Sequence, residues 1–372
     1  MYSHLFSPIE VGGLKLENRI TMAPLYLGYA GQGGTVSPLL LEHYRLMGAS
    51  GAALITVENA TVDHPHGSAS DRTLRLDIEK NLDDLRDLVG VLRAQNAKAC
   101  IQLNHAGRFA GAAPEPVAPS AVETFGFTPK ALSLQEIEDI QAKFVAAAKR
   151  AKQAGFDMLE LHGGTGYLLA QFVSPRTNHR SDDYGGPLEN RMRFPLEVFR
   201  RVKEAVGDFP VGYRFLADEF LPDGLKLEES VQFAKALSQA GVAYLSVMGG
   251  TYESFFLPEI VQKSKTLGYM ADLAQEVKKK VQVPVITAGR ISTAEVAENI
   301  LASGQADMVG LARVLWADPQ WPQKVYQGRE QEIIHCDPEC EDVCMQLVMQ
   351  GKPAYCPQWP PEKTKYLKEL FK

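Results

Sequence analysis

The stretch LELHGGTGYLLAQFVSPRTNHRSDDYGGPLENRMR, residues 159–193, organises the chain. An apolar run, residues 156–161, ends at His162 and is followed by a glycine-rich turn and then by Tyr167. A buried strand that ends in this way delivers polar side chains into a loop, so we interpret the stretch as the reactive edge of a barrel. His162 and Thr165 would hold an oxygen by hydrogen bonds, while Tyr167, with an ordinary pKa near ~10, would give up a proton. The alternative is a core tyrosine and a histidine that is hydrogen-bonded to backbone.

Apolar runs and helix-like segments alternate along the chain. Eight runs have the length of buried strands, namely Ile20–Met22, Ala53–Val57, Ala99–Leu103, Asp157–Leu161, Val211–Phe215, Tyr244–Val247, Pro284–Thr287 and Met308–Leu311. Most are followed by predicted helices, namely Leu82–Ala94, Leu134–Ala154, Leu188–Val206, Leu227–Ala240, Ala271–Val281 and Thr293–Ser303. This alternation predicts an α/β fold with a parallel sheet, and eight units predict closure into a (β/α)8 barrel.

Smaller signals refine this prediction. A hairpin around Gly12-Gly13 is expected to close the bottom of the barrel. Two helix starts carry capping-box patterns, Ser133 with Glu136 and Ser292 with Glu295. Residues 110–128, with their Pro and Gly, are predicted to form an inserted loop. We expect one barrel over residues 1–330 and a cysteine-rich, metal-binding extension over residues 331–372.

Composition excludes several classes of function. The 372 residues are 45% hydrophobic and 23% charged, and the net charge is −6. An acidic chain has no general attraction to nucleic acid or anionic lipid, and no apolar run reaches 18 residues, so we expect neither a nucleic-acid nor a membrane role. The N-terminus lacks a secretory signal, so a cytoplasmic protein is expected, as a monomer or a homo-oligomer.

Polar groups gather at the carboxyl ends of the predicted strands, where barrels place their active sites. The residues at these strand ends are Ala23, Pro24, Leu25, Tyr26, Glu58, Asn59, Gln102, His105, His162, Tyr167, Arg214, Gly249–Tyr252, Gly289, Arg290, Gly310, Ala312 and Arg313. A charge in the apolar VGYRF run must be paired, so Arg214 is predicted either to face an anionic ligand edge or to form an internal ion pair, for example with Glu58. TAGR and GLAR end strands seven and eight, where barrels commonly bind phosphate.

Two motifs of nucleotide-binding domains do not occur. No G-x-G-x-x-G follows a predicted strand, and no G-x-x-x-x-G-K-[ST] is present. Any nicotinamide donor, NADH or NADPH, would therefore bind transiently.

The motif HGGTGYLLAQFVSPRTNHRSDDYGGPLENRMRF resembles the strand-four signature of the old yellow enzyme family, the FMN-dependent ene-reductases. The resemblance covers nearly the whole chain and recurs in at least five motifs, CIQLNHAGR among them. It implies an FMN-binding barrel, hydride delivery from flavin N5 and Tyr167 as the proton donor. It also implies that Gln102 and Arg214 contact the isoalloxazine ring and that the TAGR and GLAR loops bind the FMN phosphate.

This sequence departs from the family pattern at three positions. Thr165 stands where relatives carry His or Asn in the pair that grips the substrate carbonyl. Tyr26 replaces a Cys or Thr beside the flavin, and Tyr252 aligns with a histidine acid of the 2,4-dienoyl-CoA reductases. We assign catalytic roles to Tyr167, His162, Thr165 and Tyr252.

Four cysteines, Cys336, Cys340, Cys344 and Cys356, form the pattern C-x3-C-x3-C-x11-C near the C-terminus. Four thiolates suit a 4Fe-4S cluster or tetrahedral zinc. The segment is similar to the cluster-binding segment of the 2,4-dienoyl-CoA reductase branch, which continues into FAD and NAD(P)H domains that are not seen here. The expected partner is therefore a separate flavoprotein or ferredoxin that donates electrons.

These observations predict an FMN-dependent oxidoreductase that reduces an activated C=C bond in an enone or an enoyl-CoA thioester. The alternatives are an electron-transfer subunit with flavin and an iron-sulfur cluster, and a flavin-free barrel lyase or isomerase.

Overall fold

The computed structural model describes residues 2–336, 340 and 342–370. Eight parallel strands close into a barrel in the order β10-β11-β12-β3-β4-β5-β8-β9. Their bounds are β3 Ile20–Met22, β4 Leu54–Thr61, β5 Lys98–Asn104, β8 Met158–Gly163, β9 Val211–Asp218, β10 Leu245–Gly249, β11 Val285–Thr287 and β12 Met308–Leu311. Each overlaps one of the eight predicted runs, so the (β/α)8 barrel is confirmed.

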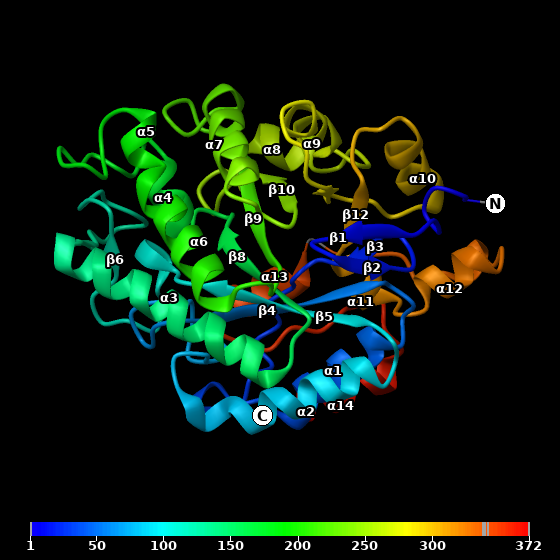
Figure 1. Cartoon of the computed structure of the whole chain (residues 1–372). Coiled ribbons are helices and arrows are strands. Elements are labelled where there is room, and N and C mark those ends of the chain that lie inside the picture. The colour runs from blue at the N-terminus through cyan, green and yellow to red at the C-terminus, as the bar shows by residue number, and fades with distance from the viewer. Residues whose placement is uncertain (1, 337–339, 341, 371–372) are drawn as a thin grey trace.

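Helices surround the barrel (Figure 1), because each presents an apolar stripe to the strands. The longer ones are α1 Pro38–Gly48, α2 Leu82–Arg93, α3 Leu134–Ala154, α6 Arg193–Val206, α7 Leu227–Gln239, α9 Ala271–Lys278 and α10 Ala294–Ala302. The shorter ones are α4 Leu168–Val173, α5 Leu188–Arg191, α8 Pro258–Lys263, α11 Arg313–Ala317, α12 Trp321–Tyr326, η1 Gln32–Gly34, η2 Glu79–Asn81, η3 Gly107–Phe109 and η4 Glu330–Glu332.

Two helix predictions need correction. The segment 188–206 was expected to be one helix, but α5 and α6 are separate, with Met192 between them. The capping box at Ser133 is present, whereas the one at Ser292 is wrong. Helix α10 begins one residue later, and Thr293 is its N-cap because the Thr293 side chain accepts a hydrogen bond from the Val296 amide.

The hairpin of β1 Ile9–Val11 and β2 Leu14–Leu16 closes the bottom of the barrel, as predicted. Its Val11 and Leu16 pack with residues at the N-terminal ends of the strands, among them Leu54, Cys100 and Met158. From the inserted loop, β6 Val117–Ala118 pairs in parallel with β7 Lys130–Ala131, which lies just after the loop. The hairpin occupies one end of the barrel, so the opposite end is available for a site.

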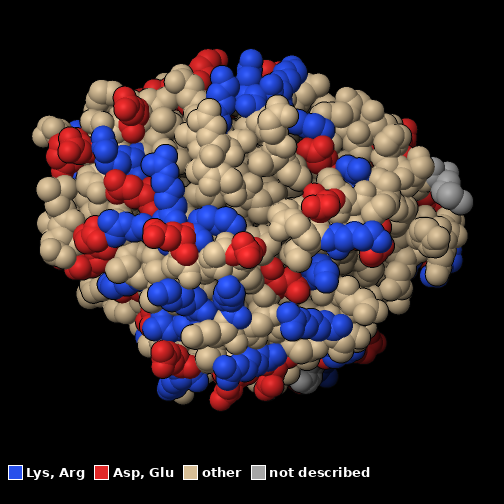
Figure 2. Space-filling model, viewed as in Figure 1, with Lys and Arg blue, Asp and Glu red and all other residues tan. Residues whose placement is uncertain are grey.

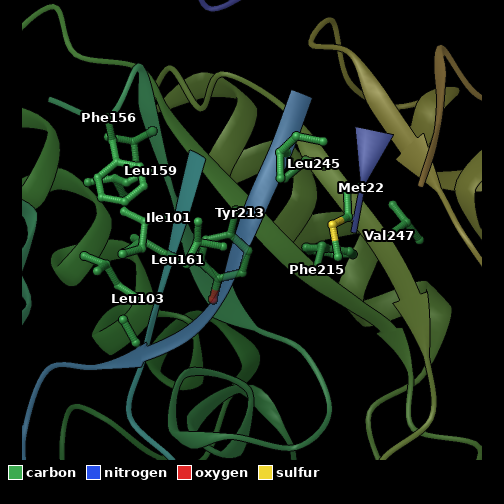
Figure 3. Close-up of a cluster of buried hydrophobic side chains, with 14 of the residues drawn as sticks. Met22, Ile101, Leu103, Phe156, Leu159, Leu161, Tyr213, Phe215, Leu245 and Val247 are labelled. Atoms are coloured by element: carbon green, nitrogen blue, oxygen red, sulfur yellow. The ribbon is translucent and has the colours of Figure 1, made fainter. Parts of the chain in front are cut away.

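The strands have two different faces. Figure 3 shows Ile101, Leu159, Tyr213 and Phe215 in a cluster of buried hydrophobic side chains, and this cluster also contains residues of the surrounding helices, such as Phe233. Side chains alternate along a strand, so the residues between them point into the barrel. These inward residues include polar ones, namely Gln102, Glu160, Arg214 and Ser246. The layer between barrel and helices therefore supplies the core, and the barrel interior carries chemistry.

After the barrel, the chain adds α13 Val343–Met349 and α14 Pro361–Leu370. On the face seen in Figure 2, basic and acidic side chains lie interspersed. Within the described ranges, no helix combines the length and apolar character that a bilayer crossing requires.

Candidate active site

A strained turn after β8 carries the first three predicted residues. Thr165 has φ +59, which is unfavourable for a β-branched residue, and Gly166 has φ +86. Gly166 packs closely against Thr251 of the loop after β10. Strain of this kind is found at functional sites, where the surrounding structure holds it in place. The turn returns the chain so that the rings of His162 and Tyr167 meet edge to face, with centroids 4.8 Å apart.

Tyr167 forms a pair with Tyr252 from the loop after β10. Their hydroxyl oxygens are 2.8 Å apart. Burial raises the pKa of both tyrosines, and the neighbouring Tyr252 raises that of Tyr167 further, while the Asn59 side chain acts in the opposite direction. Both phenols are therefore neutral near pH 7 and each has a proton to give. The structure thus brings together two of the residues that the sequence had placed on different strands.

His162 is a neutral imidazole. Burial lowers its pKa well below the ordinary range, and the charge of Arg214 adds to this effect. Its Nδ1 accepts a hydrogen bond from the Gly164 amide at 3.2 Å. The proton is therefore on Nε2, which can donate to an oxygen. The hydroxyl of Thr165 points elsewhere, because it donates to the Met248 sulfur at 3.6 Å.

A buried ion network fixes the loop that carries Tyr252. The guanidinium of Arg108 pairs with Glu253 and donates to the Thr124 hydroxyl at 3.0 Å. Glu253 also accepts from Arg176 at 3.1 Å. Three loops are tied together in this way beside the tyrosine pair. No local sequence pattern indicates this network, because its members lie far apart along the chain.

Arg214 lies inside the barrel and donates to the Ser246 hydroxyl at 2.8 Å. It is enclosed by protein, yet its side chain keeps an intermediate accessible surface through the mouth of the barrel. The predicted ion pair with Glu58 is wrong, since the carboxylate that experiences the charge of Arg214 is that of Glu160. Glu58 follows a register shift in β4 after Val57, and its carboxylate instead accepts from the Leu27 amide.

Many of the predicted flavin-binding residues form an accessible rim along one side of the mouth, whereas Ala23, Asn59, Gln102 and Gly310 are buried. Most of those at the ends of β3, β9, β11 and β12 are partly exposed, namely Pro24, Leu25, Tyr26, Arg214, Gly289, Arg290, Ala312 and Arg313. Buried polar atoms without a protein partner lie on the same strands or next to them, namely Asn59 Oδ1 and Thr287 Oγ1. Gly289 has φ +98, and a Cβ on Gly310 would touch Ala23. Exposed backbone, unpaired acceptors and a guanidinium fit a planar, polar cofactor with an anionic tail.

The two arginines of the predicted phosphate loops differ. Arg290 has φ +50, and its Nε donates to the Ser264 carbonyl at 2.6 Å. It lines a cavity of about 480 Å³ together with Lys265, His335 and Cys336. Arg313 pairs with Asp342 and lies within electrostatic reach of the thiols of Cys336 and Cys344. The phosphate side of the rim and the cysteine segment are therefore neighbours.

The four cysteines of the extension are free thiols. Burial raises the pKa of Cys336, Cys344 and Cys356, the last to about 11, and the four sulfurs act on one another electrostatically. In the part of the chain that the structure describes, no three His, Cys, Asp or Glu side chains converge at metal-binding distance. Among these described residues, the thiols are gathered in one region without converging at metal-binding distance. Their soft sulfur donors suit an iron-sulfur cluster or zinc.

Sequence reasoning missed Glu160, which is 1% exposed and accepts hydrogen bonds from Gln102 and Tyr244. The spacing of polar residues within the buried strands could have indicated it. In two strands a polar residue precedes another by two positions, Glu160 before His162 and Gln102 before Asn104. Such spacing places both residues on one face of the strand.

The comparisons with known proteins agree with this geometry. A family model described as the NADH:flavin oxidoreductase / NADH oxidase family matches residues 4–332. The chain is 46% identical over 343 residues to a protein of Thermoanaerobacter brockii named NADH oxidase, a match that covers 90% of this chain and 52% of that protein. It is 36% identical over 328 residues to an NADPH dehydrogenase of Bacillus cytotoxicus, covering 87% of this chain and 92% of the other.

Among solved structures, a 2-naphthoyl-CoA reductase in complex with 2-naphthoyl-CoA superposes with a TM-score of 0.93. The sequence identity is 28%, and the match covers 98% of this chain and 58% of the other. The chain thus spans about half the length of the NADH oxidase and of this reductase.

Proposed function

The chain belongs to the NADH:flavin oxidoreductase / NADH oxidase family, the old yellow enzyme family, and from this premise we propose that it is an FMN-dependent oxidoreductase that reduces activated C=C bonds. The observation that carries the proposal is the hydrogen-bonded pair of the buried Tyr167 and the partly buried Tyr252, beside a neutral His162 at the mouth of the barrel. Neutral proton donors beside a flavin site suit alkene reduction, which needs one hydride and one proton.

The roles of the residues follow from their placement. Gln102 and Arg214 would bind the ring of FMN, and Gly289, Arg290, Gly310, Ala312 and Arg313 would bind its phosphate, while Ala23, Pro24, Leu25, Tyr26 and Asn59 line the remaining edge. Bound FMN supplies hydride from N5 to one alkene carbon. Tyr167 gives its proton to the neighbouring carbon, and the Nε2 proton of His162 polarises the carbonyl oxygen of the substrate. Thr165 assists once its hydroxyl turns from Met248.

The substrate class is an α,β-unsaturated carbonyl compound, either an enone or an enoyl-CoA thioester. The likeness to the 2-naphthoyl-CoA reductase over 98% of this chain favours a CoA thioester of a conjugated acid. Family membership favours a flavin enzyme over a flavin-free lyase or isomerase. NADH or NADPH would reduce the flavin by binding transiently at its face.

The cysteine segment would hold a 4Fe-4S cluster, with zinc as the second candidate for Cys336, Cys340, Cys344 and Cys356. Four free thiols are gathered in one region, and two of them, those of Cys336 and Cys344, lie within electrostatic reach of Arg313 on the phosphate side of the rim. This arrangement supports a cluster within electron-transfer reach of the flavin. A flavoprotein or ferredoxin would then deliver single electrons through it. In the rival function, a pure electron-transfer subunit, Tyr167 would have no chemical role.

The substitution Tyr167→Phe tests the proposal. Reduction of the flavin by NAD(P)H or dithionite should be unchanged, whereas reoxidation by an enone or enoyl-CoA should slow by about 10²–10⁴-fold, because the proton donor is lost. Stopped-flow absorbance measures both half-reactions. Tyr213→Phe is a matched control, since Tyr213 is buried and its hydroxyl has no hydrogen-bond partner among the residues that the structure describes. Equal reoxidation rates in Tyr167→Phe and wild type would favour the electron-transfer function.

A further inference from the structure

The barrel interior contains a buried carboxylate beneath the proposed flavin site. Strand register places Gln102 beside Glu160, and Glu160 beside Gly212. Tyr244, the residue before β10, lies at the same level, and a Cβ on Gly212 would come within 2.2 Å of its ring. The absence of a side chain at Gly212 therefore lets the Tyr244 ring cross the interior toward Glu160.

Both oxygens of Glu160 are occupied by hydrogen-bond donors. The Gln102 amide nitrogen donates to Oε1 at 2.7 Å, and the Tyr244 hydroxyl donates to Oε2 at 2.9 Å. Two donors of this kind stabilise an anionic carboxylate that burial disfavours. Neither donor is a cation, so the positive charge that balances the carboxylate must come from elsewhere.

Arg214 supplies that charge from the next level of the barrel. It pairs in register with His162 and Ser246, two positions beyond the level of Glu160. Burial raises the pKa of Glu160, and the charge of Arg214 acts against that rise. Burial likewise lowers the pKa of Arg214, and Glu160 is the first of the charges that act against that fall. The guanidinium thus lies between the buried carboxylate below and the accessible mouth above.

We propose that Glu160 is the counter-ion of Arg214 and thereby sets the reduction potential of the bound flavin. The inference rests on the proposed function, because it takes the ligand above Arg214 to be FMN. Reduction of FMN by two electrons and one proton leaves a negative charge at its N1/O2 edge, which Arg214 stabilises. An anionic Glu160 offsets part of that stabilisation and keeps the potential low. Glu160 touches no ligand, so it is a positioning residue that acts through Arg214.

The test is Glu160→Gln in the flavin-loaded protein. The amide keeps the shape and both hydrogen bonds, because the side chain of Gln102 can turn over to present its oxygen. Without the negative charge, binding of reduced relative to oxidised FMN should strengthen about tenfold, which for a two-electron couple corresponds to a potential higher by about 30 mV. Sulfite, which adds to oxidised flavin and leaves a charge at the same edge, should bind about tenfold more tightly. Both are read from absorbance titrations, without substrate turnover.

Further variants separate charge from shape. Glu160→Met is neutral and needs no hydrogen bond, so it should reproduce the shift of Glu160→Gln even if the latter folds poorly. Glu160→Asp keeps the charge and should stay nearer to wild type. Glu219→Gln is the control, since Glu219 is an equally buried carboxylate that is hydrogen-bonded to Ser174 and the Leu225 amide.

Two negative outcomes are distinguishable. A neutral variant at Glu160 that holds FMN with wild-type potential and wild-type sulfite affinity would overturn this inference alone. Wild-type protein that binds no FMN would overturn the proposed function as well.

Discussion

The barrel interior and the cysteine segment place their functional groups by different means. In the barrel, Glu160 and Arg214 are held by strand register and by neighbours at 2.7–2.9 Å. In the segment, Cys336 and Cys344 share a region and an electrostatic neighbour, Arg313, but among the described residues they do not converge with a third ligand at metal-binding distance. Backbone hydrogen bonds fix the first site before any ligand binds, whereas the free energy of metal binding completes a site of the second kind.

The part of the extension around Cys356 is nevertheless attached to the barrel. The Ala354 carbonyl accepts from the Tyr29 hydroxyl at 2.6 Å, and its amide donates to the Leu27 carbonyl at 2.9 Å. The indole of Trp359 donates to the Ala317 carbonyl at 3.1 Å and packs edge to face on Trp316. The chain around Cys356 is therefore anchored to the barrel by residues on both sides of that cysteine.

The substitution Cys344→Ser removes one of the four predicted metal ligands and has the largest expected effect. We expect about four iron atoms per chain in anaerobically purified wild type and almost none in the variant, because a hydroxyl is a poor replacement for a thiolate ligand. FMN content should be unchanged, since the barrel site is built without the cluster. Iron, zinc, sulfide and flavin analyses measure this.

Cys100→Ala is the matched control for that experiment. Cys100 is buried among the hairpin residues at the bottom of the barrel, far along the chain from the other four cysteines. Its removal should leave the iron content at the wild-type value. Zinc in place of iron would identify the other candidate occupant, and flavin lost together with the metal would contradict the independence of the two sites.

A second substitution, Trp359→Ala, tests whether the C-terminal extension is attached to the barrel. Trp359 is 7% exposed, and truncation of a buried tryptophan typically costs about 3–5 kcal/mol of folding free energy. Urea unfolding followed by far-UV circular dichroism should show the whole barrel transition shifted. Trp359→Phe keeps the ring contact and loses the hydrogen bond to Ala317, so it should cost only about 1 kcal/mol. An unchanged barrel transition would mean that the extension unfolds separately.

The sequence sufficed for the barrel because its strands are buried apolar runs and its helices are amphipathic, and both patterns are local. It also placed His162, Tyr167 and Arg214 at one rim, because strand ends in a parallel barrel meet there. It failed on the partner of Arg214, since the choice between Glu58 and Glu160 depends on a register shift in β4 that no local pattern reveals.

For the cysteine segment, the sequence predicted the ligands but neither the metal nor the geometry of the site. Spacing identified the four candidate ligands, but C-x3-C-x3-C-x11-C suits more than one metal. The ion itself decides the final geometry. A pattern of ligands therefore predicts less than a pattern of strands does.

The substitution Glu58→Gln should change how the stability of the barrel depends on pH. Burial raises the pKa of Glu58 from its ordinary 4.5 to about 8, so the folded protein retains a proton that the unfolded chain loses. This contribution to stability is complete below pH 4.5 and is lost as pH rises to about 8, at about 1.4 kcal/mol per pH unit. The variant has no carboxyl at this position and therefore no such loss. The free energy of unfolding of Glu58→Gln minus that of wild type should thus be about 2–3 kcal/mol larger at pH 8 than at pH 6.

Urea unfolding at both pH values measures the effect. Glu189→Gln, at an exposed position on α5, is the control and should show no such trend. A pH-independent difference between Glu58→Gln and wild type would mean that Glu58 is ionised in the folded protein.

The smallest expected effect is that of Tyr252→Phe, which probes the barrel site alone. When Tyr167 releases its proton it becomes a phenolate, and the Tyr252 hydroxyl, 2.8 Å away, can donate to that charge. A hydrogen bond to a charged group is worth about 1.5–3 kcal/mol. Its loss should slow reoxidation of the reduced flavin by an enone or enoyl-CoA at least about tenfold, which is less than the effect of Tyr167→Phe, and should leave iron content and flavin reduction unchanged. Stopped-flow reoxidation rates of the two single variants and the double variant would assign the roles. If Tyr252→Phe were as slow as Tyr167→Phe and the double variant no slower, the two tyrosines would act as one proton-donating unit.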